Sequence, residues 1–270
     1  EMARKIEAAC NARKDDNFVV LARTDAIALE GLEGAIKRAK LYERAGADLI
    51  FADAIKGEEQ IKALVDAVDI PVFADGDTGY GDVNNVVRMV GEYERAGVAG
   101  LFIEDQVFPK RCGHMEGKAV IPMEEMVAKI RAALYAREDP DLVVMARTDA
   151  LAVNGFEDAL KRGKAYAEAG ADLIFVEAVT TEEQMRRVNA EIPKPTLANM
   201  IEGGKTPIKT PAALQELGYD VVVFPCSLTY AITKTVQRCL EELRVNGTTN
   251  ALLDDMTTFD EFFEFIGARD

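Results

Sequence analysis

The sequence has no tryptophan, one histidine (His114), four cysteines and no serine before Ser227. The cysteines (Cys10, Cys112, Cys226 and Cys239) show neither a CxxC spacing nor the density of a disulfide framework, and there is no histidine pair. These absences exclude the usual zinc ligand sets and a disulfide scaffold. Reduced thiols in a cytoplasmic compartment are the simplest interpretation, with an organelle matrix as the alternative.

The sequence also lacks long hydrophobic runs and an excess of basic over acidic residues. The longest apolar runs, such as 220–224, are far shorter than the roughly 20 residues of a membrane helix. Acidic residues outnumber basic ones by 47 to 32, which gives a formal net charge of -15. A protein that neutralises phosphates carries a basic face, so neither a membrane span nor a nucleic-acid partner is expected.

What the chain does contain is an internal repeat. Residues 1–60 align with 125–184 without a gap, and more than half of the positions are identical. Each copy predicts an amphipathic helix, a buried strand ending Ala-Arg-Thr-Asp-Ala, an alanine-rich helix and a strand within Ala-Gly-Ala-Asp-Leu-Ile-Phe. The strands are continuous apolar runs, as in parallel sheets covered on both faces.

The same rhythm fills the rest of the chain. Eight strands are predicted, at 18–22, 48–52, 70–74, 99–103, 142–146, 172–176, 195–198 and 220–224. Helical patterns lie at 33–45, 57–68, 83–96, 124–136, 157–169, 181–191, 210–217 and 228–245. This alternation predicts a (β/α)8 barrel, of the TIM type, over residues 1–247, with a doubly wound open sheet as the competing fold. Residues 248–270 form a C-terminal helical extension whose four phenylalanines pack either on this barrel or on another subunit.

Charged side chains follow the strands where a barrel of this kind forms its active site. The positions are Arg23 and Asp25, Asp53, Asp75 and Asp77, Glu104 and Asp105, Arg147 and Asp149, Glu177, and Asn199. Because burying unpaired charge is costly, a ligand explains this ring better than packing does.

Two stretches stand out within the ring. Asp75-Gly76-Asp77-Thr78-Gly79-Tyr80-Gly81 places two carboxylates close together, which suits Mg²⁺ that keeps several waters; a solvated Asp-Gly turn explains the spacing equally well. Lys110-Arg111-Cys112-Gly113-His114 surrounds a cysteine with bases, which favours its thiolate and a reactive role over a plain surface loop.

Together with Glu104-Asp105-Gln106, Ala146 to Ala150, Phe175 to Ala178 and Ala198-Asn199-Met200, these stretches resemble the isocitrate lyase and phosphoenolpyruvate mutase superfamily. The 2-methylisocitrate lyase and dimethylmalate lyase branch is most similar, and the match runs from about Ile70 to the C-terminus. Relatives that handle phosphonates or decarboxylate oxaloacetate generally lack the cysteine.

The resemblance implies the following roles. Asp77 would bind Mg²⁺ (or Mn²⁺) directly, with Asp75 and Glu104 acting through water. Arg147, Glu177, Asn199, Tyr80 and Gly113 would bind a di- or tricarboxylate substrate, while Cys112 serves as acid/base with its charge set by Lys110, Arg111 and His114. Homodimers or homotetramers are implied as well.

The chain departs from the family at its N-terminus. Arg23-Thr24-Asp25-Ala26 and Ala52-Asp53-Ala54 stand where the family has a Ser-Gly strand end that grips pyruvate. Three functions therefore stay open. They are a Mg²⁺-dependent carbon-carbon lyase, active or impaired; an oxaloacetate decarboxylase or hydrolase; and a recombinant or chimeric barrel scaffold without activity.

Overall fold

The computed structural model describes residues 2–15, 17–52, 55, 57–111 and 115–265. Within them the strands are β1 (Leu21–Thr24), β2 (Leu49–Ala52), β3 (Val72–Asp75), β4 (Gly100–Glu104), β5 (Val143–Thr148), β6 (Leu173–Val176), β7 (Thr196–Asn199) and β8 (Val221–Val223). The helices are α1 (Met2–Ala12), α2 (Ala26–Arg44), α3 (Glu58–Val65), α4 (Val83–Arg95), α5 (Met123–Ala136), α6 (Leu151–Asn154), α7 (Phe156–Ala169), α8 (Glu182–Glu191), α9 (Pro211–Glu216), α10 (Ser227–Asn246), the 3-10 helix η1 (Asn250–Asp255) and α11 (Phe259–Phe265).

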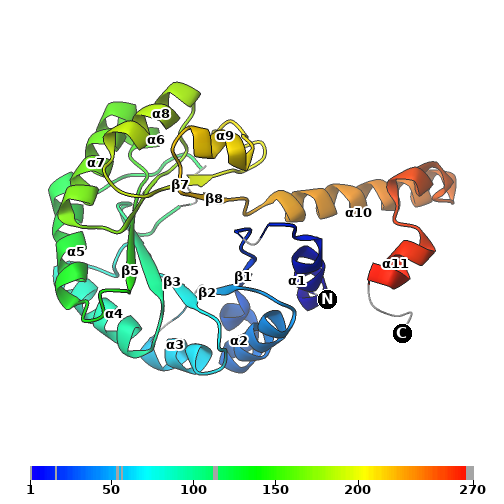
Figure 1. Ribbon diagram of the computed structural model, residues 1–270, viewed down its shortest axis with the longest axis horizontal. Helices are drawn as coiled ribbons and strands as arrows, with labels where there is room; N and C mark the ends of the chain where they lie inside the picture. The colour runs from blue at the N-terminus through cyan, green and yellow to red at the C-terminus, as the bar shows by residue number, and fades with distance from the viewer. Residues whose placement is uncertain (1, 16, 53–54, 56, 112–114, 266–270) are drawn as a thin grey trace.

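The strands form one sheet in the order β1 to β8, and each neighbouring pair is parallel. The sheet curls with helices on its outside (Figure 1), which confirms the predicted α/β barrel-type fold. In the described ranges no ladder joins β8 to β1, so the ring expected of a complete barrel stays open at this seam. The short β8 is one physical reason, because it offers only three residues for pairing.

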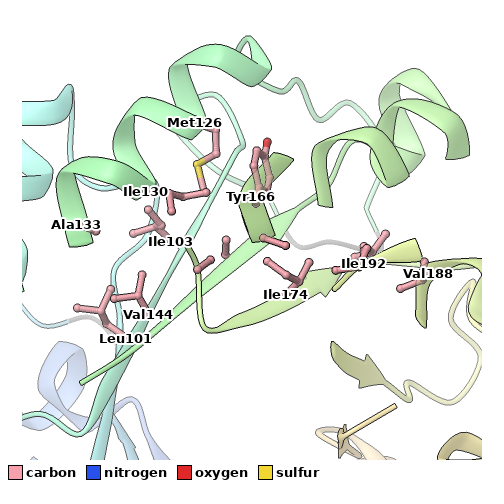
Figure 2. Close-up of a cluster of buried hydrophobic side chains, with 14 of the residues drawn as sticks. Leu101, Ile103, Met126, Ile130, Ala133, Val144, Tyr166, Ile174, Val188 and Ile192 are labelled. Carbon is pink, nitrogen blue, oxygen red and sulfur yellow. The ribbon is translucent and has the colours of Figure 1, made fainter. Parts of the chain in front are cut away.

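Side chains alternate between the two faces of the sheet. On β4, Leu101 and Ile103 face the helices, where they pack with Met126 and Ile130 of α5 (Figure 2). Phe102, between them in sequence, belongs to a separate cluster inside the curl. Glu104 continues the inward series, and this alternation delivers charged side chains to the inside edge of the sheet.

The two repeat copies fold alike and lie four strands apart. Arg13 Nη1 lies 2.7 Å from Asp48 Oδ2 in the first copy, and Arg137 Nη1 lies 2.6 Å from Asp172 Oδ2 in the second. Gly31 (φ 73°) and Gly155 (φ 90°) occupy matching positive-φ positions. Gly31 interrupts the helical backbone within α2, just as Gly155 separates α6 from α7. The part of α2 after Gly31 corresponds to the helix expected over 33–45, and a short helical turn precedes it.

The C-terminal helices leave the barrel. α10 projects away from the sheet and α11 lies near its far end (Figure 1). None of the described residues of α10 is buried, and Phe259 is 76% exposed. The expectation that the phenylalanines pack on this barrel is therefore wrong for Phe259, while packing on another subunit stays a prediction. None of the helices in the described ranges combines the length and low polarity that crossing a bilayer requires.

Candidate active site

The site lies at the carboxyl ends of the strands, called the mouth, above a layer of aromatic rings. Phe51 stacks on Phe73 with ring centroids 6.3 Å apart and on Phe102 at 6.2 Å. Phe175 belongs to the same interior cluster as Phe102. These four rings form a phenylalanine floor inside the curl, and the charged groups of Lys110 and Arg147 lie over two of them.

Asp75 and Asp77 lie side by side and share one cation. Lys110 Nζ lies 2.8 Å from Asp75 Oδ2 and 2.7 Å from Asp77 Oδ1, and also sits over the Phe102 ring. Burial alone would lower the pKa of Lys110, but Asp75 and Glu104 outweigh it, so its pKa is raised and the amine stays charged. The sequence placed Lys110 beside the cysteine; the structure places it between the two carboxylates.

The loop that carries these carboxylates is fixed by its backbone. Gly76 N donates to Phe102 O at 2.9 Å, and a Cβ at Gly76 would lie 2.5 Å from that oxygen. Glu104 N donates to Asp77 O at 2.9 Å. Asp77 has a φ of 50°, which few residues other than glycine, Asn and Asp adopt readily. These backbone hydrogen bonds therefore fix the loop that carries both carboxylates against the end of β4.

Side chains that sequence reasoning missed support the same loop. Lys129 on α5 is buried and donates through Nζ to Thr78 O at 3.1 Å. The hydroxyls of Tyr80 and Tyr93 lie 3.2 Å apart, and each donates to Asp75 O at 3.4 Å. Tyr80, expected to bind substrate, thus contacts the loop. The repeat keeps a lysine at both Lys5 and Lys129, which was the available signal.

Glu104 is the inward carboxylate at the end of β4. It is 1% exposed, its Oε1 has no hydrogen-bond partner, and its Oε2 lies 3.6 Å from Arg147 Nε. Burial raises the pKa of Glu104 to about 7, although Arg147 and Lys110 oppose the shift. A buried carboxylate oxygen without a donor is costly unless a ligand satisfies it.

Arg147 links the acids of neighbouring strands. Its Nε lies 2.9 Å from Asp149 Oδ2 and its Nη2 lies 3.2 Å from Glu177 Oε2. The guanidinium is also 5.1 Å from the Phe175 ring centroid. Lys118, another residue that the sequence did not reveal, lies 2.8 Å from Asp149 Oδ1. Burial would raise the pKa of Asp149, but Arg147 and Lys118 hold it below its usual range.

Asn199 extends this row on β7. Its Nδ2 donates to Glu177 Oε2 at 3.4 Å, while its Oδ1 is buried without a partner. Glu104, Arg147, Glu177 and Asn199 are thus brought together as the sequence predicted, and two of their oxygens await a donor or a cation.

Asp105 lies next to this row but points into a structural network. It accepts hydrogen bonds from Thr148 Oγ1, Tyr166 Oη and Arg162 Nη1 at 2.7, 2.7 and 3.1 Å, and from Asp149 N at 2.9 Å. With four donors and no exposed area, it anchors β5 and α7 to β4 and is not directed at a ligand.

The base of the Lys110 to His114 loop is held by Gln106. Its Oε1 accepts from Arg111 N at 2.9 Å and its Nε2 donates to Arg111 O at 2.8 Å. Cys112, Gly113 and His114 lie outside the described residues, so their predicted roles stay predictions. Asp53 also lies outside them.

The donor set agrees with a divalent ion of the Mg²⁺ type. In the described ranges no three His, Cys, Asp or Glu side chains gather in a metal-ligand arrangement. Asp75 and Asp77 nevertheless hold one positive charge between them. Glu104, at the end of the neighbouring strand β4, adds a buried oxygen, Oε1, that has no hydrogen-bond partner. Mg²⁺ commonly takes one or two carboxylates and completes its shell with water, so these residues fit it.

Comparisons with known proteins agree with this geometry. The family profile described as phosphoenolpyruvate phosphomutase matches twice, at residues 1–73 and 59–244. The 2,3-dimethylmalate lyase of Eubacterium barkeri is 49% identical over 76% of this chain and 71% of its own. The 2-methylisocitrate lyase of Aeropyrum pernix is 48% identical over 75% of this chain and 65% of its own. The matched stretch thus spans about two thirds of these relatives.

Solved structures extend the similarity over the whole chain. A crystal structure of 2,3-dimethylmalate lyase superposes with a TM-score of 0.66 and 31% identity, covering 98% of this chain and 91% of the other. Oxaloacetate acetylhydrolase bound to 3,3-difluorooxalacetate gives 0.65 and 28%, covering 99% and 92%. Phosphonopyruvate hydrolase with oxalate and Mg²⁺ gives 0.60 and 27%, covering 98% and 95%.

The profile covers most of the chain, and the 2,3-dimethylmalate lyase is 49% identical over about three quarters of it. This chain belongs to the phosphoenolpyruvate mutase/isocitrate lyase superfamily.

Proposed function

We propose that the protein is a Mg²⁺-dependent carbon-carbon lyase that cleaves a 2-methylisocitrate-like 2-hydroxy acid to pyruvate and a dicarboxylate. The observation that carries the proposal is the pair of partnerless buried oxygens, Glu104 Oε1 and Asn199 Oδ1, in a row that also contains Arg147. Such a row suits a substrate with several carboxylate and hydroxyl oxygens. The similarity to 2-methylisocitrate and 2,3-dimethylmalate lyases supports the same reaction class.

Asp77 would hold the divalent ion directly, with Asp75 and Glu104 acting through its waters. Mn²⁺ has a similar preference for oxygen ligands and can take the same place. When bound, the ion supplies Lewis-acid stabilisation of negative charge on the α-oxo product. Lys110 must yield its place between the two carboxylates, and its position over the Phe102 ring leaves it inside the mouth.

Arg147, Glu177 and Asn199 would hold the substrate's oxygens, and Tyr80 and Gly113 would close the site around it. The Arg147 guanidinium is fixed by Asp149 and Glu177, so little side-chain entropy is lost when it binds a carboxylate. Arginine pairs with carboxylates through two parallel hydrogen bonds, which sets the orientation of the acid as well as its affinity.

The cleavage is a retro-aldol step. The substrate hydroxyl loses its proton to a base in the mouth, its oxygen becomes the keto oxygen of pyruvate, and the carbon-carbon electron pair passes to the dicarboxylate fragment. Cys112 then donates a proton to that carbanion, with Lys110, Arg111 and His114 setting its charge environment.

Two alternatives come from specific observations. Oxaloacetate acetylhydrolase is among the similar structures, so hydrolysis or decarboxylation of oxaloacetate is the second candidate. A barrel without activity is the third, because Arg23 and Asp53 replace the Ser-Gly strand end of the family and Ser227 lies at the start of α10.

The assembly is proposed to be a homodimer or homotetramer in the cytoplasm or an organelle matrix. The exposed apolar side chains of α10 and α11 include Leu228, Leu240 and Phe259. Fully burying such side chains contributes about 1.5 to 3 kcal/mol each. Light scattering at micromolar concentration should report an oligomer, and a monomer would contradict the proposal.

Product analysis by proton NMR distinguishes the three functions. The protein is incubated with 2-methylisocitrate, 2,3-dimethylmalate or oxaloacetate, each with MgCl2 and with EDTA. The lyase releases pyruvate and succinate from 2-methylisocitrate, and pyruvate and propionate from 2,3-dimethylmalate. Acetate, the proton-bearing product of oxaloacetate hydrolysis, or pyruvate from oxaloacetate alone, would favour the second candidate. No product from a folded sample would favour the third.

A further inference from the structure

Gln106 lies at the neck of the long loop that joins β4 to α5. Its backbone pairs with Val120 in an isolated antiparallel bridge, and next to this bridge Ile121 N donates to Asp105 O at 2.9 Å. The side chain of Asp105 is in turn bonded to β5 and α7. The neck is therefore joined to the rigid part of the sheet, and Gln106 projects its side chain from a fixed position.

Both polar atoms of the Gln106 amide bind the backbone of Arg111. Its Oε1 accepts from Arg111 N at 2.9 Å and its Nε2 donates to Arg111 O at 2.8 Å. Gln106 is 1% exposed, so little water competes for these two hydrogen bonds. The amide thus fixes the main chain of Arg111 and leaves the side chains of the neighbouring residues to find their own partners.

One of these neighbours is Lys110, whose ammonium lies between two carboxylates. Its Nζ is 2.8 Å from Asp75 Oδ2 and 2.7 Å from Asp77 Oδ1, and its side chain is 29% exposed. Holding a long, flexible lysine in one place costs side-chain entropy, and a backbone that is already fixed lowers the total cost of ordering this contact. Lys110 offsets one of the two negative charges, whereas a divalent ion would offset both.

We propose that Gln106 is a positioning residue that acts through Lys110. By holding Arg111 it keeps the Lys110 ammonium between Asp75 and Asp77, so the loop neutralises the acidic pair until a divalent ion displaces the lysine. Lys110 and the ion then compete for the same carboxylates, and metal binding is linked to the position of the loop. The proposal rests on the proposed metal site and names the residue that sets how strongly the lysine competes there.

A double-mutant cycle on Mg²⁺ affinity, measured by titration calorimetry of the full chain, tests this. Lys110→Met removes the competitor and should tighten Mg²⁺ binding about 10-fold or more, the scale of a charged hydrogen bond. Gln106→Met has a similar length but no amide. It should tighten binding about threefold in the parent and leave it unchanged in the Lys110→Met background. A general loosening of the site would instead weaken binding in both backgrounds.

Acetylation of lysine amines, followed by peptide mass spectrometry, gives a second readout that needs no metal. Lys110 should react about threefold faster in Gln106→Met than in the parent, because it spends more time outside its ion pairs. Lys62, 55% exposed on α3, is the internal reference. Asn189→Leu is the matched control, because its amide also donates to a backbone oxygen, that of Leu217 at 2.8 Å, between α9 and the start of β8.

The proposal is overturned if Lys110→Met does not tighten Mg²⁺ binding, if Gln106→Met acts equally in both backgrounds, or if Gln106→Met leaves the acetylation of Lys110 at the parent rate. Circular dichroism of each variant excludes loss of fold as the cause. If Gln106→Met does not fold, an unchanged Mg²⁺ affinity in Lys110→Met still overturns the proposal. A parent that binds no Mg²⁺ would contradict the proposed function instead, and the acetylation rates then decide whether Gln106 holds Lys110 in place.

Discussion

The hydroxyl of Tyr166 donates a hydrogen bond of 2.7 Å to Asp105 Oδ2, and both residues are fully buried. In the first copy Tyr42 is the counterpart of Tyr166, and its hydroxyl receives a 3.4 Å bond from Arg38 Nη1. β8 is followed by Phe224 and Pro225, which offer no acid in place of Asp105. The carboxylate that ties β4 to the second copy therefore has no equivalent at the open seam between β8 and β1.

Replacing these tyrosines should cost more stability in the second repeat copy than in the first. Tyr166→Phe removes a donor from a buried carboxylate, so we expect a loss of about 1.5 to 3 kcal/mol in the free energy of unfolding. Tyr42→Phe, the matched control, should lose under about 1 kcal/mol because its hydrogen bond is long. Urea-induced unfolding measures both, and equal losses would contradict the asymmetry.

Binding of Mg²⁺ should depend on Asp77. The substitution Asp77→Asn is preferred to alanine because Asn tolerates the positive φ at this position. We expect at least a roughly tenfold loss of Mg²⁺ affinity, about 1.4 kcal/mol, by titration calorimetry. The control is Asp66→Asn, because Asp66 caps the C-terminal end of α3 and forms an exposed ion pair with Lys62. Unchanged affinity in Asp77→Asn would remove the acidic loop from the account.

Stability without divalent ions should fall as the pH rises through the titration of Glu104. Its pKa is raised from 4.5 to about 7 by burial, so the folded state holds the proton more tightly than the unfolded state does. The stabilisation is complete below about pH 4.5 and is lost by about pH 7, on the order of 2 to 3 kcal/mol.

Glu104→Gln should remove this component. Unfolding is measured in EDTA between pH 5 and pH 8, and the advantage of the glutamine variant should grow with pH. A difference between parent and variant that stays constant over this range would show that Glu104 does not titrate as the buried site requires.

Cys112 should react faster with iodoacetamide at neutral pH than the other cysteines. Arg111 and His114 favour its thiolate, although Lys110 is engaged by Asp75 and Asp77. Cys10 provides the contrast, because its Sγ donates to Gly46 O at 3.1 Å and burial raises its pKa. We expect roughly threefold faster labelling or more by peptide mass spectrometry. Equal labelling of Cys112 and Cys239 would remove the loop from catalysis.

The sequence predicted the strand order because apolar runs and their spacing are local properties. Leu101, Phe102 and Ile103 form one such run, and alternation in the sheet then fixes which of them faces the floor. The repeat likewise predicted that Arg23 and Arg147 end equivalent strands, as the register of β1 and β5 confirms.

Contacts between distant segments could not be predicted in this way. Lys110 meets Asp75 across 35 residues, and Tyr166 meets Asp105 across 61. The sequence marks Asp75, Lys110 and Asp105 as charged groups near strand ends but does not show which side chain each one contacts. Only the fold shows that Lys110 neutralises the acidic pair and that Asp105 is structural. The open seam between β8 and β1 was also not predicted, because it depends on how few residues β8 offers for pairing.

The most direct test of the central claim is pyruvate release from 2-methylisocitrate, followed by coupling to lactate dehydrogenase. The parent should release pyruvate and succinate in equal amounts with MgCl2 and none with EDTA. Cys112→Ser should keep Mg²⁺ binding but lose turnover by about 10²- to 10⁴-fold, because a hydroxyl is too weak an acid to protonate the carbanion. Cys239→Ser, on α10, should retain activity. A folded, Mg²⁺-loaded parent that releases no pyruvate, or a Cys112→Ser variant as active as the parent, would contradict the account.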